Sequence, residues 1–123
     1  MIEGPEGLLL VRRPDDDEDL PGVWGLPALS LEPGESEQHG VRRAGHDKLG
    51  VEVEPLERVG RDRTMTDWKA RIVSGEPAVP QAGPHTQYAE LRFGKPSELV
   101  PAARLGSLCS RVLLRARGLD WNP

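Results

Sequence analysis

The sequence predicts an α+β fold, or a sheet sandwiched between helices. Short apolar segments of strand length alternate with two helix-like segments along the chain. The strand-like segments follow one another as hairpins do, and not in the regular strand–helix–strand repeats of a parallel sheet. The chain has 123 residues, enough for one hydrophobic core and too few for two. We therefore expect a single domain over residues 1–123.

The charge and hydropathy of the chain exclude some classes of binding partner. The formal net charge is −4, and acidic and basic residues are mixed along the chain, whereas a nucleic-acid surface normally carries a basic excess. The lone Cys109 cannot form an internal disulfide. No apolar run approaches the roughly 20 residues that cross a bilayer, and residues 1–4 lack the features of a signal peptide. We expect a cytoplasmic protein that binds neither nucleic acid nor membrane.

The first third of the chain predicts strands. Residues 8–11 are uninterrupted Leu-Leu-Leu-Val, so we expect a strand buried on both faces. Residues 15–19 are an acidic cluster, typical of a solvated loop. Residues 23–27 and 28–31 then predict short extended pieces around a proline.

Residues 37–49 predict a helix. Ser36 is a suitable N-cap, and Gly50 tolerates the left-handed conformation that often ends a helix. Gly40 and Gly45 each cost this helix about 0.5–1 kcal/mol relative to alanine, so packing must hold it. Its predicted core-facing stripe has members four residues apart: Val41, Gly45 and Leu49.

Two further strands follow that helix. Residues 51–59 alternate well enough for a strand in which Pro55 lies at an edge or a bulge. Residues 66–74 are the strongest strand signal in the chain. One face of this second strand is predicted to be buried: Trp68, Ala70 and Ile72. The other face is predicted to be more exposed: Lys69 and Arg71.

The last third predicts one strand and one long helix. Residues 86–93 form the strand, and residues 96–99 begin a turn of helix. Residues 107–118 form the last helix, packed on the opposite face of the sheet from the 37–49 helix. Its inward side chains are Leu108, Val112 and Leu113, and its mostly outward side chains are Arg111, Arg115 and Arg117. Cys109 lies among apolar neighbours and is interpreted as a small core residue.

In this order the elements resemble the Nudix hydrolase family, whose signature is G-x5-E-x7-R-E-U-x-E-E-x-G-U, with U a bulky aliphatic residue. Seven residues separate Glu35 from Arg43, as the signature requires, and Gly50-Val51 close it. Residues 8–13 resemble the family's strand before the signature, and residues 23–27 its W-x-x-P approach. The resemblance covers almost the whole chain and implies an α/β/α sandwich.

The chain departs from this signature where the family keeps its metal-binding carboxylates. The glutamate after the arginine is replaced by Ala44, and the final glutamate pair is replaced by Asp47 and Lys48. Further replacements are Ala28-Leu29 for the double glycine, Gly45 for the aliphatic residue and, loosely, Gln87 for a later glutamate. The signature is thus degenerate, and it keeps Glu35, Arg43, Asp47 and Gly50.

The resemblance implies a hydrolase of a nucleoside-diphosphate-linked substrate that uses Mg²⁺ or Mn²⁺. It implies that Glu35, Arg43 and Asp47 are catalytic and that Asp47 is the metal ligand. Helix positions i, i+3 and i+4 share a face, and here that face carries a methyl group, a carboxylate and an ammonium. One carboxylate holds Mg²⁺ mainly when substrate phosphates supply other ligands, so we expect weak metal binding.

A second hypothesis is a catalytically silent Nudix-fold module that binds a nucleotide or another phosphorylated small molecule. Lys48 would then contact phosphate directly as a point charge, with Arg13 as a second substrate-binding cation. Arg43 has a structural alternative as well, as an ion pair to Glu35 or Asp47 that braces the loop against the helix.

A transition-metal site at His39 or His46 is a weaker alternative, because a lone exposed histidine usually has no such role. A homodimer is possible. Residues 1–2 are expected to pair as the stub of a strand that relatives have in full, and the true start codon is expected to lie upstream.

Overall fold

The computed structural model of the chain describes residues 1–79 and 88–122. In chain order the elements are β1 (Glu3–Gly4), β2 (Gly7–Arg12), β3 (Trp24–Gly25), α1 (Glu37–Leu49), β4 (Glu52–Asp62), β5 (Met65–Ser74), β6 (Glu90–Gly94), the 3₁₀ helix η1 (Pro96–Leu99), α2 (Val100–Arg104) and α3 (Leu108–Ala116). The strand predicted over residues 86–93 begins at Glu90 as β6, and residues 88–89 are described but lie outside it. The first two residues of that prediction, including Gln87, lie outside the described ranges.

Strand β2 pairs antiparallel with β1, β3 and β6 in a four-stranded sheet. All four residues of the 8–11 run are buried, as predicted. Leu8 and Leu10 belong to one core cluster, and Leu9 and Val11 belong to the other. The uninterrupted apolar run therefore supplies both cores, because successive side chains of a strand point to opposite faces.

Strands β4 and β5 form a long antiparallel hairpin with three register shifts, one of them between Pro55 and Glu57. The prediction of a bulge at Pro55 is confirmed. A parallel bridge from Ile2 to Ala70 joins this hairpin to the first sheet. The amide of Ala70 donates to the carbonyl of Met1 at 2.8 Å, and Leu9 N–H donates to Ile2 O at 2.8 Å. Residues 1–2 therefore pair as expected.

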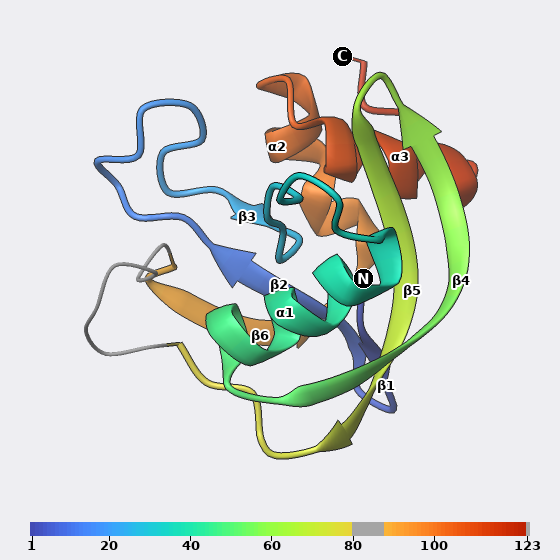
Figure 1. Cartoon of the computed structure of the whole chain (residues 1–123). Coiled ribbons are helices and arrows are strands. Elements are labelled where there is room, and N and C mark those ends of the chain that lie inside the picture. Colours follow the sequence, from blue (N-terminus) through green and yellow to red (C-terminus); the bar gives the residue numbers. More distant parts are fainter. Residues whose placement is uncertain (80–87, 123) are drawn as a thin grey trace.

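Helix α1 covers one face of the strands and α3 covers the other (Figure 1). Helix α1 packs on β4, and α3 packs on β4 and β5. The hydroxyl of Ser36 accepts the amide of His39 at 3.1 Å, and Gly50 ends the helix at φ 67°. Both predicted boundaries are confirmed. Leu49 is buried and Val41 is half-buried against the same cluster, so the α+β sandwich with helices on both faces is the observed fold.

The predicted burial of β5 is partly wrong. Trp68 and Ile72 are only half-buried, and Lys69 is half-buried rather than exposed, whereas Arg71 is exposed. The buried residues of β5 are Asp67 and Ala70. Trp68 keeps one edge toward solvent because its indole N–H donates to the carboxylate of Glu37 at 2.8 Å.

The C-terminal helices differ in detail from the prediction. Helix α3 begins after the N-cap Ser107 and buries Val112 and Leu113 as expected, and also Leu114. Leu108 is half-buried. Helix α2 was not predicted. Its five residues include Pro101, which the first turn of a helix tolerates.

Candidate functional site

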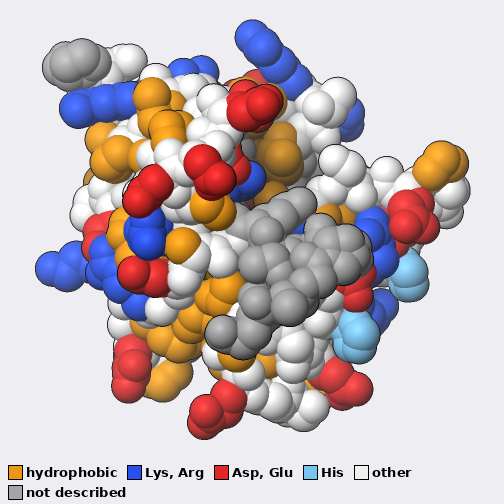
Figure 2. Space-filling model, turned by 90° about the vertical axis from the view of Figure 1, so that its left-hand side faces the viewer, with side chains coloured by type: hydrophobic (Ala, Val, Ile, Leu, Met, Phe, Trp, Pro, Cys, Tyr) orange, Lys and Arg blue, Asp and Glu red, His pale blue; other side chains and the backbone are white. Residues whose placement is uncertain are grey.

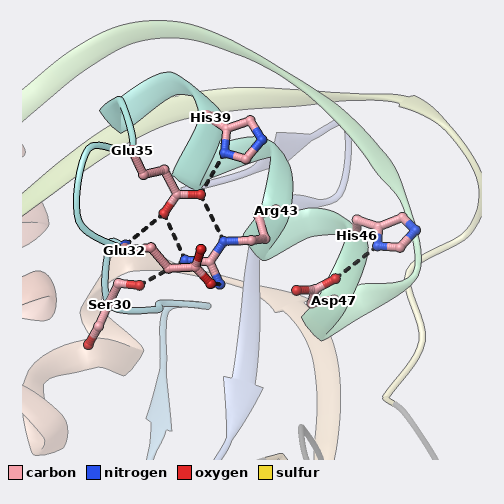
Figure 3. Close-up of polar contacts among 7 residues, drawn as sticks. All are labelled: Ser30, Glu32, Glu35, His39, Arg43, His46 and Asp47. Atoms are coloured by element: carbon pink, nitrogen blue, oxygen red, sulfur yellow. Dashed lines mark hydrogen bonds and ion pairs between the residues drawn. The ribbon is translucent and has the colours of Figure 1, made fainter.

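Glu35 is the centre of a hydrogen-bonded cluster where the 30–35 loop meets α1 (Figure 3). Arg43 donates twice, from Nε to Oε2 and from Nη2 to Oε1, both at 2.8 Å. The backbone amide of Glu32 donates to Oε1 at 3.0 Å, and His39 Nδ1 lies 2.6 Å from Oε2. Both carboxylate oxygens of Glu35 are thus occupied by protein groups.

This cluster ties the loop to the helix. Gly34 turns the chain at φ 78°, and Arg43 also donates to the carbonyl of Ser30 at 2.9 Å. The hydrogen bonds from Arg43, above all, hold the pKa of Glu35 far below its usual range, and Glu35 raises the pKa of Arg43 in return. Of the two structural alternatives for Arg43, the geometry matches the ion pair to Glu35. The catalytic roles of both residues stay predictions.

Asp47 and Lys48, the next residues of the signature, lie about one turn beyond Arg43 on α1. The side chain of Asp47 is 28% exposed, and its Oδ1 lies 2.9 Å from His46 Nδ1 (Figure 3). Lys48 is 5% exposed, which is unusual for a lysine. The helix face that the family fills with carboxylates therefore presents the methyl group of Ala44, one aspartate and one buried ammonium.

Lys48 and Arg13, the two predicted substrate-binding cations, lie around one aromatic ring. Lys48 Nζ is 5.8 Å from the ring centroid of Tyr88, and Arg13 Cζ is 5.9 Å from it. Tyr88 is positioned by its hydroxyl, which accepts the backbone amide of Ala28 at 3.1 Å. Arg13 also pairs with Asp17 at 3.2 Å. The structure therefore brings the two cations together.

The environment lowers the pKa of Lys48. Burial is the largest cause, and the positive charge of Arg13 adds to it, while Asp47 opposes the shift. Sequence reasoning missed Tyr88, because nothing in its local spacing distinguishes it. Its contacts come from residues 13, 28 and 48, which are distant in the sequence.

The residues present do not fit Mg²⁺ or Mn²⁺. These hard ions take oxygen ligands, and Mg²⁺ demands near-octahedral geometry. Glu35 has no unoccupied oxygen, and the helix positions beside Asp47 carry a methyl group and an ammonium. In the described part of the chain, no three His, Cys, Asp or Glu side chains gather as a metal site would require. His39 and His46 each lie against a different carboxylate.

On the side of the molecule drawn in Figure 2, Lys and Arg side chains are interspersed with Asp and Glu side chains. Among the described residues, no helix is long and apolar enough to cross a membrane.

Comparisons with known proteins place the fold. No protein-family model matches the sequence, and no curated protein matches it. Solved structures do match. A NUDIX hydrolase from Nitrosomonas europaea is 18% identical with a TM-score of 0.69, over 95% of this chain and 84% of that chain. A MutT protein from Methanosarcina mazei is 18% identical with a TM-score of 0.66, over 96% and 88%.

An ADP-ribose pyrophosphatase from Streptococcus suis is 19% identical with a TM-score of 0.64, over 95% of this chain and 85% of that chain. The chain therefore has the Nudix fold, and the resemblance of its motifs is confirmed at the level of the fold.

Proposed function

We propose that this protein is a Nudix-fold module that binds a nucleotide or another phosphorylated small molecule without the metal chemistry of a hydrolase. One observation carries the proposal. Lys48 is buried on the face of α1 where hydrolysis needs metal-binding carboxylates, and Arg13 lies with it around Tyr88.

A buried ammonium opposes a divalent cation. Two unit charges about 5 Å apart interact by about 3 kcal/mol at an effective dielectric near 20, and a divalent ion doubles that repulsion. A repulsion of this size lowers affinity by several orders of magnitude. Asp47 is the one carboxylate on this face, so Lys48 opposes the attraction of Asp47 for the ion where further carboxylates would have added to it.

The same charges favour an anion. Burial and, after it, the positive charge of Arg13 lower the pKa of Lys48, and a phosphate placed beside the two cations would offset their repulsion. The binding of a phosphate should therefore raise the pKa of Lys48. A rise in the pKa of Lys48 on binding would therefore distinguish direct contact with phosphate from a phosphate held through a metal ion.

A second candidate is a hydrolase with a weak metal site at Asp47. The partial exposure of Asp47 favours it, because substrate phosphates could supply the remaining ligands of a Mg²⁺ ion. The two candidates differ in whether the ligand binds without a divalent ion.

Titration calorimetry with ADP in EDTA separates them. We expect binding without a divalent ion. Lys48→Met should weaken binding at least about tenfold, while Lys95→Met, at an exposed lysine of another surface, should not. Binding that requires Mg²⁺ and is followed by release of phosphate products would favour the hydrolase.

The remaining expectations belong to this proposal. We propose a single domain over residues 1–123 and a cytoplasmic protein that does not bind nucleic acid. A homodimer is a further proposal, which light scattering tests directly.

A further inference from the structure

A cavity of about 460 Å³ lies between α1, residues 26–31 and the β4–β5 hairpin. Its volume is in the range of small-molecule pockets, about 300–1,000 Å³. Three small residues of α1 are among those that line it: Gly40, Ala44 and Gly45. The opposite wall includes Trp68 and Met65 of β5. The lining is more apolar than polar, and its charged members are Glu37, Arg61 and Asp67.

Asp67 is the unusual polar group of this cavity. Its residue is 5% exposed, and among the described residues its Oδ2 is a buried side-chain atom with no hydrogen-bond partner. Burial raises the pKa of Asp67 to about 7, against the opposing effect of the Met1 amine. The thiol of Cys109, from α3, lines the cavity as well.

An unpaired buried carboxyl oxygen does not stabilise a fold. Leaving such a group without a partner costs about 1–3 kcal/mol, and more when it is charged. Buried polar atoms in native proteins nearly always have partners, and an exception calls for an explanation. The open space beside Asp67 supplies one, since a ligand in the cavity can donate the missing hydrogen bond.

The side chains that line the cavity indicate which class of ligand it can hold. Apolar side chains and the indole of Trp68 suit a flat ring. A carboxylate accepts hydrogen bonds and pairs best with adjacent N–H donors. We infer that Asp67 is a specificity-determining residue, which selects a heterocycle with neighbouring N–H donors, such as the N1–H and N2 amino edge of guanine.

This inference rests on the proposed function, because it takes the ligand to be a nucleotide. Ala44 connects the two sites. It lines the cavity, and it lies one helical turn from Lys48 on α1. A base held at Asp67 would thus have its phosphates near the face that carries Lys48.

Titration calorimetry with GDP and ADP on the full chain tests the assignment. We expect GDP to bind about ten- to a hundredfold more tightly, the range of a charge-assisted hydrogen bond. The adenine edge offers a donor beside an acceptor, so it cannot give Asp67 two donors. Asp67→Asn, which has the same shape, should reduce the preference to about threefold or less. Asp62→Asn, an acid of the same hairpin outside the cavity, should leave it unchanged.

A modified nucleotide tests the same hydrogen bond on the unmodified chain, without a protein variant. The diphosphate of 1-methylguanosine lacks the N1–H donor and should bind the unmodified chain at least about tenfold more weakly than GDP. Equal affinity for GDP and ADP, or a preference that survives Asp67→Asn, would overturn the inference while the proposed function stands. Failure to bind either nucleotide would overturn both.

Discussion

Gly45 allows α1 to lie close to β4, and a single methyl group should disturb that contact. A Cβ atom at Gly45 would lie 2.9 Å from both γ-carbons of Val53 and 3.3 Å from the carbonyl of Val51. Ordinary carbon contacts are about 3.5–4.0 Å. Valine has one strongly preferred side-chain rotamer in most settings, and a backbone carbonyl cannot swing away. We therefore predict that Gly45→Ala destabilises the protein.

The expected size follows from two opposing effects. Alanine is better than glycine in a helix by about 1 kcal/mol. Overpacking a filled core costs about 1–3 kcal/mol. The net loss in free energy of unfolding should therefore be about 1 kcal/mol.

Gly40→Ala is the matched control on the same helix. The nearest atom to a Cβ there is the Cδ2 of Leu31, the far end of a side chain that is 48% exposed. Leu31 can move, so this variant should gain about 0.5–1 kcal/mol. In urea the two unfolding midpoints should differ by about 1 M. A Gly45→Ala variant as stable as Gly40→Ala would refute this account of the packing.

Three further predictions concern charged groups. The pKa of Asp67 is raised from 3.8 to about 7, so protonation of Asp67 stabilises the folded state. This contribution, at most about 4 kcal/mol, is fully present below about pH 4 and is lost as pH rises through 7. Urea unfolding across this pH range should show a smaller loss of stability in Asp67→Asn, and identical profiles for the two proteins would contradict this prediction. The double variant Ala44→Glu, Lys48→Glu should bind Mg²⁺ at least tenfold more tightly, measured by calorimetry, and should gain pyrophosphatase activity or show more of it. An unchanged affinity for Mg²⁺ would count against the repulsion of the ion by Lys48. Arg43→Lys loses the bidentate geometry, so hydrogen exchange should become faster in residues 30–35; unaltered exchange there would argue against the brace.

The sequence predicted the elements that depend on local chemistry. Ser36 and Gly50 fixed both ends of α1, because capping is read from single residues. The apolar run at residues 8–11 predicted a strand buried on both faces. The order of these elements was specific enough to indicate the Nudix fold.

What the sequence could not predict depends on contacts between distant segments. The half-burial of Trp68 follows from Glu37 on another element, and the unpaired oxygen of Asp67 follows from the space left by α1. Period-two alternation carries no information about either contact. The convergence of Arg13 and Lys48 on Tyr88 is likewise a tertiary result, although the two cations were named from the family resemblance.

A turnover assay decides whether this chain hydrolyses nucleotides with the help of a divalent metal ion. The unmodified chain and Asp47→Ala are incubated with nucleoside diphosphate derivatives and Mg²⁺ or Mn²⁺, and released phosphate products are measured. We predict no metal-dependent release by the unmodified chain above that of Asp47→Ala, at nucleotide concentrations that saturate the chain in a separate binding measurement in EDTA. Metal-dependent turnover that Asp47→Ala abolishes would contradict this prediction and establish Asp47 as the ligand of a working metal site.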